Sequence, residues 1–343
     1  MKKFRFAAVC AAAVLAGCGC AWAQSGVVTV YSADGLHDGT PNWYQTEFDA
    51  FTKATGIKVQ YIEAGSAVVV DRLQMEKADP QADVLVTIPP FIQKAASDGL
   101  LQPFTPAGAN EIPAAGKDTQ NRFFPLVNNY TDFIYNANVL KQPPKTFDAL
   151  LDSKFRNKIQ YSTPGQAGDG TAVMLLVFHV FGGKNQGFAY LKKLQANNLG
   201  PSSSTGRLTA LVNKGELWVA NGDVQMNTAQ LKQNPDIRIF WPVGPDGKRW
   251  TVDLPYDIGL VKGAPHAANG KKLIDFLLSR EAQEQVSTLS DGFPVRKDAD
   301  PADATYKNLQ VTIKGVSVYT PDWNKELPHL QQDVARWHQE TGS

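Results

Sequence analysis

The sequence predicts an α/β protein with two lobes, each built on a mixed, mainly parallel sheet covered by helices. Runs of β-branched residues of strand length alternate with apolar residues at helical spacing. This rhythm occurs in the first half of the chain and again in the second half. A length of 343 residues also suggests about two domains, at roughly 100–200 residues per domain.

The composition is that of a globular protein and excludes some classes of partner. Hydrophobic residues make up 43% of the chain and charged residues 20%, which rules out wholesale disorder. The chain has 34 Lys and Arg against 33 Asp and Glu, so its formal charge is +1. The generic electrostatic case for binding nucleic acid or an anionic membrane is therefore absent, and we expect no nucleic-acid partner.

The first 23 residues have the pattern of an export signal. A basic start at residues 2–5 precedes an apolar stretch over 6–15, and AWA at 21–23 forms an A-x-A cleavage site. We expect residues 1–23 to be removed and the mature protein to work in the periplasm. The sequence LAGC ending at Cys18 resembles a bacterial lipobox, so anchoring through a lipid on Cys18 is the alternative.

In the first half of the chain, predicted strands and helices alternate. The strands are rich in β-branched residues and lie at 27–31 (VVTVY), 57–62 and 83–87 (DVLVT). The helices lie at 43–54, 67–78 and 92–98. Aromatic residues recur at helical spacing in the first of them, and Gly56 supplies its C-terminal stop.

The second half repeats this pattern with its own apolar core. Its predicted strands lie at 133–135, 159–162, 217–220, 237–241 and 257–261. Its predicted helices lie at 147–151, 168–181, 208–214 and 267–278, the second of which is strongly apolar.

Polar or glycine-rich loops follow the strands of both halves. They span residues 32–39, 63–66, 163–171 and 201–206. Parallel α/β sheets bind ligands beyond the carboxyl ends of their strands, often at helix N-termini. In a protein of two lobes, these loops are expected to face one another across a cleft.

Several segments, in one consistent order along most of the chain, resemble the type II periplasmic solute-binding proteins of ABC importers. They are VVTVYSADG, FTKATGIKVQYIEAGS, ADVLVT, DGLLQPF and NNYTDFIYN. Within that family the pattern is similar to the branch that includes ferric-ion-binding proteins. YSADGLHDGTPNW, TIPPFIQKAA and STPGQAGDGT more narrowly resemble the members that bind 2-aminoethylphosphonate.

The resemblance implies a periplasmic binding protein fold of type II, with two crossing strands near 129–135 and 254–259 as its hinge. Lobe one would hold residues 26–131 and 256–295, and lobe two residues 132–255 and 296–343. The expected function is not catalytic and needs no cofactor. The protein would act as a monomer, capture 2-aminoethylphosphonate between the lobes and deliver it to an ABC permease in the inner membrane.

The ligand implied by the resemblance requires two kinds of contact. Its phosphonate needs N–H and O–H donors, and its amine needs a carboxylate or an aromatic face. Candidate donors at helix starts and strand ends are Gly65, Ser66, Thr163, Gly168, Gly170, Thr171, Ser203, Ser204 and Thr205. Candidate partners of the amine, walls and loop contacts are Asp34, Asp223, Asp253, Tyr31, Tyr130, Tyr256 and His37. For each residue, an ordinary role in a helix cap, a core or an exposed loop is the alternative.

The sequence lacks motifs that several other functions would require. Ferric-binding relatives carry an adjacent tyrosine pair after a GE segment, because Fe(III) favours phenolate oxygen. Here KGEL is followed by NGDVQM without tyrosine, so an iron site loses its expected ligands. Polyamines and phosphate compounds remain alternatives. A periplasmic phosphoester or phosphonate hydrolase is the alternative from another class, but no G-x-S-x-G, S-x-x-K or metal-binding histidine spacing appears.

Overall fold

The computed structural model describes residues 26–37, 42–114 and 116–343. The predicted export signal, its cleavage site and Cys18 lie outside these residues. Within them, no helix combines the length and the apolar character needed to cross a membrane.

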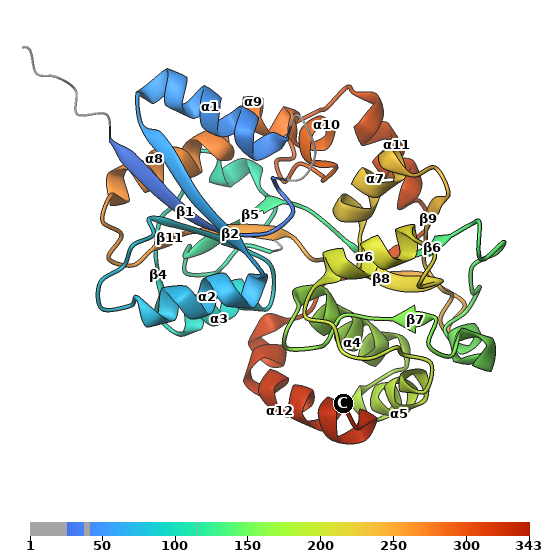
Figure 1. Ribbon diagram of the computed structural model, residues 1–343. Helices are drawn as coiled ribbons and strands as arrows, with labels where there is room; N and C mark the ends of the chain where they lie inside the picture. Colours follow the sequence, from blue (N-terminus) through green and yellow to red (C-terminus); the bar gives the residue numbers. More distant parts are fainter. Residues whose placement is uncertain (1–25, 38–41, 115) are drawn as a thin grey trace, which may run out of the picture.

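The first sheet has the strand order β2-β1-β3-β11-β4, and β5 also pairs with β11 (Figure 1). These strands are β1 (Val27–Ala33), β2 (Lys58–Ala64), β3 (Val84–Thr87), β4 (Leu101–Gln102), β5 (Phe123–Val127) and β11 (Tyr256–Val261). The helices around it are α1 (Trp43–Thr55), α2 (Ser66–Met75), α3 (Phe91–Ser97), α8 (Ala267–Leu277), α9 (Arg280–Glu284) and α10 (Val286–Ser290), with the 3-10 turn η1 (Ala109–Glu111).

Both faces of the first sheet are covered, which explains the nearly continuous apolar runs of β1 and β3. Side chains alternate along a strand. Val84 and Val86 pack in one core cluster with α1 and α8, whereas Leu85 packs in another with α2 and α3. Figure 1 shows these two pairs of helices on opposite sides of the sheet.

The second sheet has the order β7-β8-β6-β9, and a small sheet pairs β10 with β12. The strands are β6 (Thr131–Asn136), β7 (Ile159–Gln160), β8 (Val219–Asp223), β9 (Ile237–Phe240), β10 (Trp250–Val252) and β12 (Ser317–Tyr319). The helices of this half are α4 (Gly168–Val180), α5 (Lys184–Gln195), α6 (Thr205–Asn213), α7 (Val224–Gln233), α11 (Ala304–Thr312) and α12 (Trp323–Thr341), with η2 (Asp148–Leu151) and η3 (Ser153–Phe155). The expected helix at 147–151 is thus a short 3-10 turn.

The sheets are mixed, as predicted, but antiparallel pairing is more extensive than the β-α rhythm indicates. In the two main sheets, β1 pairs parallel with β2 and β3, and β7 pairs parallel with β8. Strand β11 is antiparallel to β3, β4 and β5, and β6 is antiparallel to β8 and β9. Both antiparallel strands directly follow a segment that passes from one sheet to the other, and each enters its sheet against the direction of its neighbours.

Two of the passages between the sheets run side by side. Tyr130 forms an isolated β-bridge with Asp253, and the Leu254 N–H donates to the Asn129 carbonyl at 2.9 Å. The paired residues lie at the start of the predicted crossing ranges, except Asp253, which is one residue ahead of the second range.

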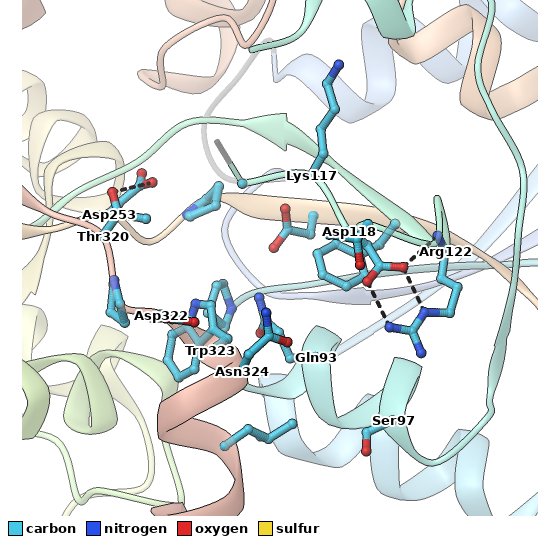
Figure 2. A pocket seen from close by; sticks show the side chains of 18 of the residues that line it. Gln93, Ser97, Lys117, Asp118, Arg122, Asp253, Thr320, Asp322, Trp323 and Asn324 are labelled. Carbon is cyan, nitrogen blue, oxygen red and sulfur yellow. Dashed lines mark hydrogen bonds and ion pairs between the residues drawn. The ribbon is translucent and has the colours of Figure 1, made fainter. Parts of the chain in front are cut away.

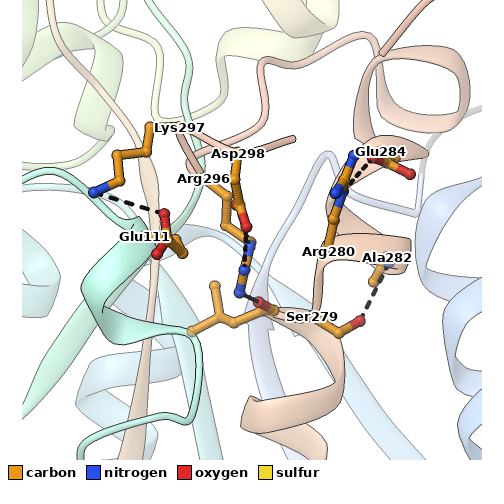
Figure 3. Close-up of polar contacts among 9 residues, drawn as sticks. Glu111, Ser279, Arg280, Ala282, Glu284, Arg296, Lys297 and Asp298 are labelled. Atoms are coloured by element: carbon orange, nitrogen blue, oxygen red, sulfur yellow. Dashed lines mark hydrogen bonds and ion pairs between the residues drawn. The ribbon is translucent and has the colours of Figure 1, made fainter. Parts of the chain in front are cut away.

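A third passage leads from α10 to α11, and polar contacts of residues 296–298 hold this passage in place (Figure 3). Arg296 donates to Asp298 at 2.8 Å and to the Leu278 carbonyl at 3.0 Å. Lys297 lies 3.6 Å from Glu111. The C-terminal helix α12 then packs on α5, where Trp337 is buried and donates to the Tyr161 hydroxyl at 3.2 Å.

Candidate functional site

A polar cavity of about 320 Å³ lies where loops of the two sheets meet the crossing segments. We call it the front cavity. Its lining comprises Asp34, Gly65, Ser66, Val68, Ile88, Asn129, Gln166, Ala167, Gly168, Asp169, Ser203, Ser204, Thr205, Asp223, Met226, Leu254 and Tyr256. Among these described lining residues there are carboxylates but no lysine or arginine.

Helices α2, α4, α6 and α7 all begin at the front cavity. Helix starts carry N–H groups without partners inside the helix and a partial positive charge. At α6 and α7 side chains cap these groups: Ser204 accepts from Arg207 N–H at 3.3 Å, and Asp223 accepts from Met226 N–H at 2.8 Å.

The starts of α2 and α4 are different. Their N-cap residues, Gly65 and Ala167, make no side-chain cap bond within the described structure. The side chains of these N-cap residues therefore do not occupy the first-turn N–H groups, which are the kind of donors that bind an anion without a cationic side chain.

Asp169 places a carboxylate in the first turn of α4. It is 5% exposed; its Oδ2 accepts from the Thr205 hydroxyl at 3.0 Å, and its Oδ1 has no hydrogen-bond partner in the described structure. Burial raises the pKa of Asp169 well above its usual value, and the charges of Asp223 and Asp34 raise that pKa further. A bound cation would relieve this repulsion.

A second buried acid, Asp132 on β6, lies behind these carboxylates. Its Oδ1 accepts from Asn227 Nδ2 at 2.5 Å, whereas its Oδ2 has no partner among the described residues. Burial, and then the charge of Asp223, raise the pKa of Asp132 well above its usual value. Asp132 therefore adds a further negative charge near the front cavity when it is ionised, and none when it is protonated.

Contacts from both sheets fix the turn after β1 against the cavity. The Tyr256 hydroxyl donates to the Asp34 carbonyl at 2.9 Å, and Gln225 Nε2 donates to the Gly35 carbonyl at 3.0 Å. Gln225 is at the start of α7 and Tyr256 at the start of β11, so this turn is held by residues from both halves of the protein.

The two halves also approach closely at Gly168. A Cβ atom placed on Gly168 would lie 2.3 Å from Ile88 Cδ1 and 3.3 Å from the Pro89 carbonyl oxygen. A side chain at position 168 would force Ile88 to move, so glycine allows the start of α4 to come this close to the end of β3.

Many of the predicted site residues come together at this cavity. Those that line it are Asp34, Gly65, Ser66, Gly168, Ser203, Ser204, Thr205, Asp223 and Tyr256. Those that do not line it are Tyr31, His37, Tyr130, Thr163, Gly170, Thr171 and Asp253.

Two predicted aromatic walls belong to packed clusters instead. The Tyr31 hydroxyl donates to the Glu76 carboxylate at 2.8 Å, and the Arg72 guanidinium lies 4.7 Å from the Tyr31 ring centroid. The Tyr130 ring packs edge-on against Phe293 at 5.3 Å.

Two predicted hydroxyl donors are bonded to the backbone of the site loops, Thr163 to the loop over 201–206 and Thr171 to its own loop. Thr163 accepts from Ser202 N–H at 2.9 Å. The Thr171 hydroxyl donates to the Ala167 carbonyl at 3.2 Å and accepts from Gly165 N–H at 3.0 Å. Both threonines shape loops that contribute other residues to the cavity lining.

His37 and Asp253 point elsewhere. His37 Nδ1 lies 3.9 Å from the Glu63 carboxylate, and its ring lies 5.1 Å from that of Tyr61. Asp253 lies on the opposite side of the crossing segment from Leu254, which lines the front cavity. Neighbouring side chains of an extended segment face opposite ways, so a one-residue difference reverses the side.

Sequence reasoning missed some lining residues: Val68, Ile88, Asn129, Gln166, Ala167, Asp169, Met226 and Leu254. Of these residues, Asp169 could have been predicted from the sequence, because it stands between two glycines at the start of an apolar helix. Aspartate is also a common helix-capping residue, and that interpretation left Asp169 out of the predicted site.

Gly170 serves packing within one half of the protein, and this gives a first prediction. An added Cβ would lie 2.3 Å from the Ser162 carbonyl oxygen, which is backbone and cannot turn away. We expect Gly170→Ala to lower the free energy of unfolding by about 1–3 kcal/mol, because α4 must shift from β7. Urea denaturation measures this, and an unchanged midpoint with an unchanged slope would contradict it.

Solved structures identify the fold. The periplasmic binding protein P5PA aligns with a TM-score of 0.79 at 22% identity, covering 92% of this chain and 99% of that one. Apo ferric ion-binding protein A of Pasteurella haemolytica aligns with a TM-score of 0.74 at 21% identity, covering 92% and 98%. The chain has the two-lobed fold of type II periplasmic solute-binding proteins, the components of ABC importers that bind the solute.

Sequence comparison gives the family. The model of the bacterial extracellular solute-binding proteins matches residues 37–284, and the chain belongs to this family. A relative from Salmonella paratyphi A, named "Putative 2-aminoethylphosphonate-binding periplasmic protein", is 59% identical over 322 residues, 94% of each chain. Iron uptake protein A1 of Synechocystis is 26% identical over 259 residues, 71% of this chain and 70% of that one.

Proposed function

We propose that this protein captures 2-aminoethylphosphonate in the front cavity and delivers it to an ABC permease in the inner membrane. The phosphonate oxygens would accept hydrogen bonds at the starts of α2 and α4. The ammonium group would lie against Asp169, with Asp34 and Asp223 nearby. The proposal includes export by a signal over residues 1–23, with a lipid anchor at Cys18 as the alternative.

One observation carries the proposal: the start of α4, which has no side-chain cap, and the unpartnered Oδ1 atom of Asp169 occupy the same turn. The helix starts would attract a simple anion, but the carboxylates would repel it. The carboxylates would attract a polyamine, but the helix starts would repel it. A zwitterion with both charges a few bonds apart suits both. The name and 59% identity of the Salmonella relative support the same ligand.

We also propose that the lobes close on the ligand, with lobe one at 26–131 and 256–295 and lobe two at 132–255 and 296–343. The close approach of Gly168 to Ile88 and the bonds that Tyr256 and Gln225 make to the turn after β1 support this. A ligand that contacts donors from both lobes favours the closed state, because only that state makes all the contacts.

A ligand panel tests the function. We expect 2-aminoethylphosphonate to raise the melting temperature by several degrees, since ligand at about 1,000 times its Kd stabilises the folded state by roughly 4 kcal/mol. Ethylphosphonate, which lacks the amine, is the matched control and should give a much smaller shift. Phosphate, putrescine and ferric citrate complete the panel. A shift with one of these and none with 2-aminoethylphosphonate would replace the proposed ligand.

A further inference from the structure

A second cavity, of about 420 Å³, lies behind the segment that leads into β11. We call it the rear chamber. Leu254 and Tyr256 line the front cavity, whereas Asp253, Pro255 and Asp257 line the rear chamber. The same short segment therefore forms a wall of both cavities.

The rear chamber is lined from both halves of the protein (Figure 2). Gln93 comes from α3, which covers the first sheet, and Trp323 and Asn324 come from the start of α12. Figure 2 shows these three side chains close together, with Asp253 and Thr320 at another side of the chamber.

Some charged groups of the chamber already have partners. Arg122 donates to Asp118 at 2.7 Å, and Lys325 lies 2.8 Å from Asp322. Lys117 donates from Nζ to the Ala109 carbonyl at 2.5 Å, and Figure 2 shows its side chain pointing away from the other labelled residues. None of these bonds involves Asp253 or Asp257.

Asp253 and Asp257 are the carboxyl groups that remain. Asp257 is 1% exposed, and its Oδ1 has no hydrogen-bond partner in the described structure. Asp253 accepts from the Thr320 hydroxyl at a long 3.4 Å. Burial raises the pKa of Asp253 to about 6, and burial together with the charge of Asp253 raises the pKa of Asp257 well above its usual value. Two carboxyls that repel each other, here the buried Asp257 and the half-buried Asp253, are stabilised in the ionised form by a cation.

We propose that the rear chamber binds a small organic cation, whose ammonium group lies between Asp253 and Asp257. Trp323 offers an aromatic face to such a cation, and Pro255 an apolar wall. A metal ion fits the site less well, since the described residues contain no group of three or more His, Cys, Asp or Glu side chains that could hold one. This site is separate from the front cavity and does not depend on the proposed function.

Titration calorimetry with n-propylammonium chloride tests the site, on the full chain in a mildly alkaline buffer that keeps the carboxyls ionised. We expect saturable binding that persists when 2-aminoethylphosphonate is present in excess. Asp257→Asn keeps the shape of the side chain and removes its charge, so it should weaken binding by about tenfold or more. Asp322→Asn removes the charge of a carboxylate that lines the same chamber but already pairs with Lys325, so this matched control should leave propylammonium binding unchanged.

The outcomes separate the rear chamber from other sites. Absence of saturable heat beyond that of sodium chloride, equal affinity in Asp257→Asn, or displacement by 2-aminoethylphosphonate would each overturn the proposal. A loss of binding in Asp169→Asn would assign the cation to the front cavity instead. If Asp257→Asn does not fold, as judged by circular dichroism, Asp253→Asn takes its place with the same expected loss.

Discussion

Gly168→Ala is expected to weaken 2-aminoethylphosphonate binding by about tenfold to a hundredfold, and to leave the stability of the ligand-free protein nearly unchanged. The added Cβ would lie 2.3 Å from Ile88 Cδ1 and 2.7 Å from Ile88 Cγ1, so the two lobes cannot approach as closely. Overpacking of this kind costs about 1–3 kcal/mol, and each 1.4 kcal/mol is a factor of ten in affinity. The three atoms nearest to the added methyl group all belong to Ile88 and Pro89 of the first half of the protein, so this contact would be relieved in an open protein. Calorimetric titration and thermal unfolding measure the two quantities separately.

The control for this variant is Gly206→Ala in α6. Gly206 also lies in the first turn of a helix that begins at the front cavity, but an added Cβ there meets no atom within 4 Å. It should bind as the wild type does. Wild-type affinity in Gly168→Ala, or an equal loss in both variants, would show that contact at Gly168 does not control binding.

Asp169→Asn is expected to reduce the affinity for 2-aminoethylphosphonate by about tenfold to a hundredfold, because a hydrogen bond to a charged group contributes about 1.5–3 kcal/mol. The amide can still accept from the Thr205 hydroxyl, which limits structural damage. Ethylphosphonate has no amine, so its affinity should stay the same or rise as one negative charge is removed. Equal losses for both ligands would contradict a role of Asp169 in binding the amine.

The same residue makes binding depend on pH. Burial and the charges of Asp223 and Asp34 raise the pKa of Asp169 in the ligand-free protein. An ammonium group favours the ionised carboxylate, so binding lowers this pKa and releases a proton at pH values below its raised value. Affinity should therefore rise with pH through that range and then level off. Asp169→Asn should lose this part of the pH dependence, and ethylphosphonate controls for ionisation of the phosphonate itself.

The fold was predictable where the pattern of side chains reflects their burial. The strand at Val27–Ala33 buries apolar residues on both faces and is a nearly continuous apolar run, whereas the helix at Trp43–Thr55 packs one set of apolar residues against a core at helical spacing. Helix α12 was missed because it is mostly polar, contains Pro328 and buries few residues. Helix α7 was missed for a similar reason, since its buried side chains include Gln225 and Asn227.

The site was predictable only as a set of loops. Glycine and hydroxyl residues at helix starts, such as Ser66 and Thr205, indicated where donors would gather. The sequence does not show whether a hydroxyl is already bonded, and Thr171 is bonded within its own loop. Nor does the sequence show which side chains of an extended segment point into a given cavity. In this protein Leu254 lines the front cavity, whereas its neighbour Asp253 lines the rear chamber.

Because the crossing segment separates the rear chamber from the front cavity, a reporter group can be attached on one side of it without changing the other. The cysteines of the sequence are Cys10, Cys18 and Cys20, all ahead of the described residues, so a cysteine introduced at Thr320 would be the only one after residue 20. A fluorescent dye attached there would lie at the rear chamber, across the crossing segment from the front cavity. Such a labelled protein would serve as an optical sensor that reports hinge movement while its solute site stays unmodified.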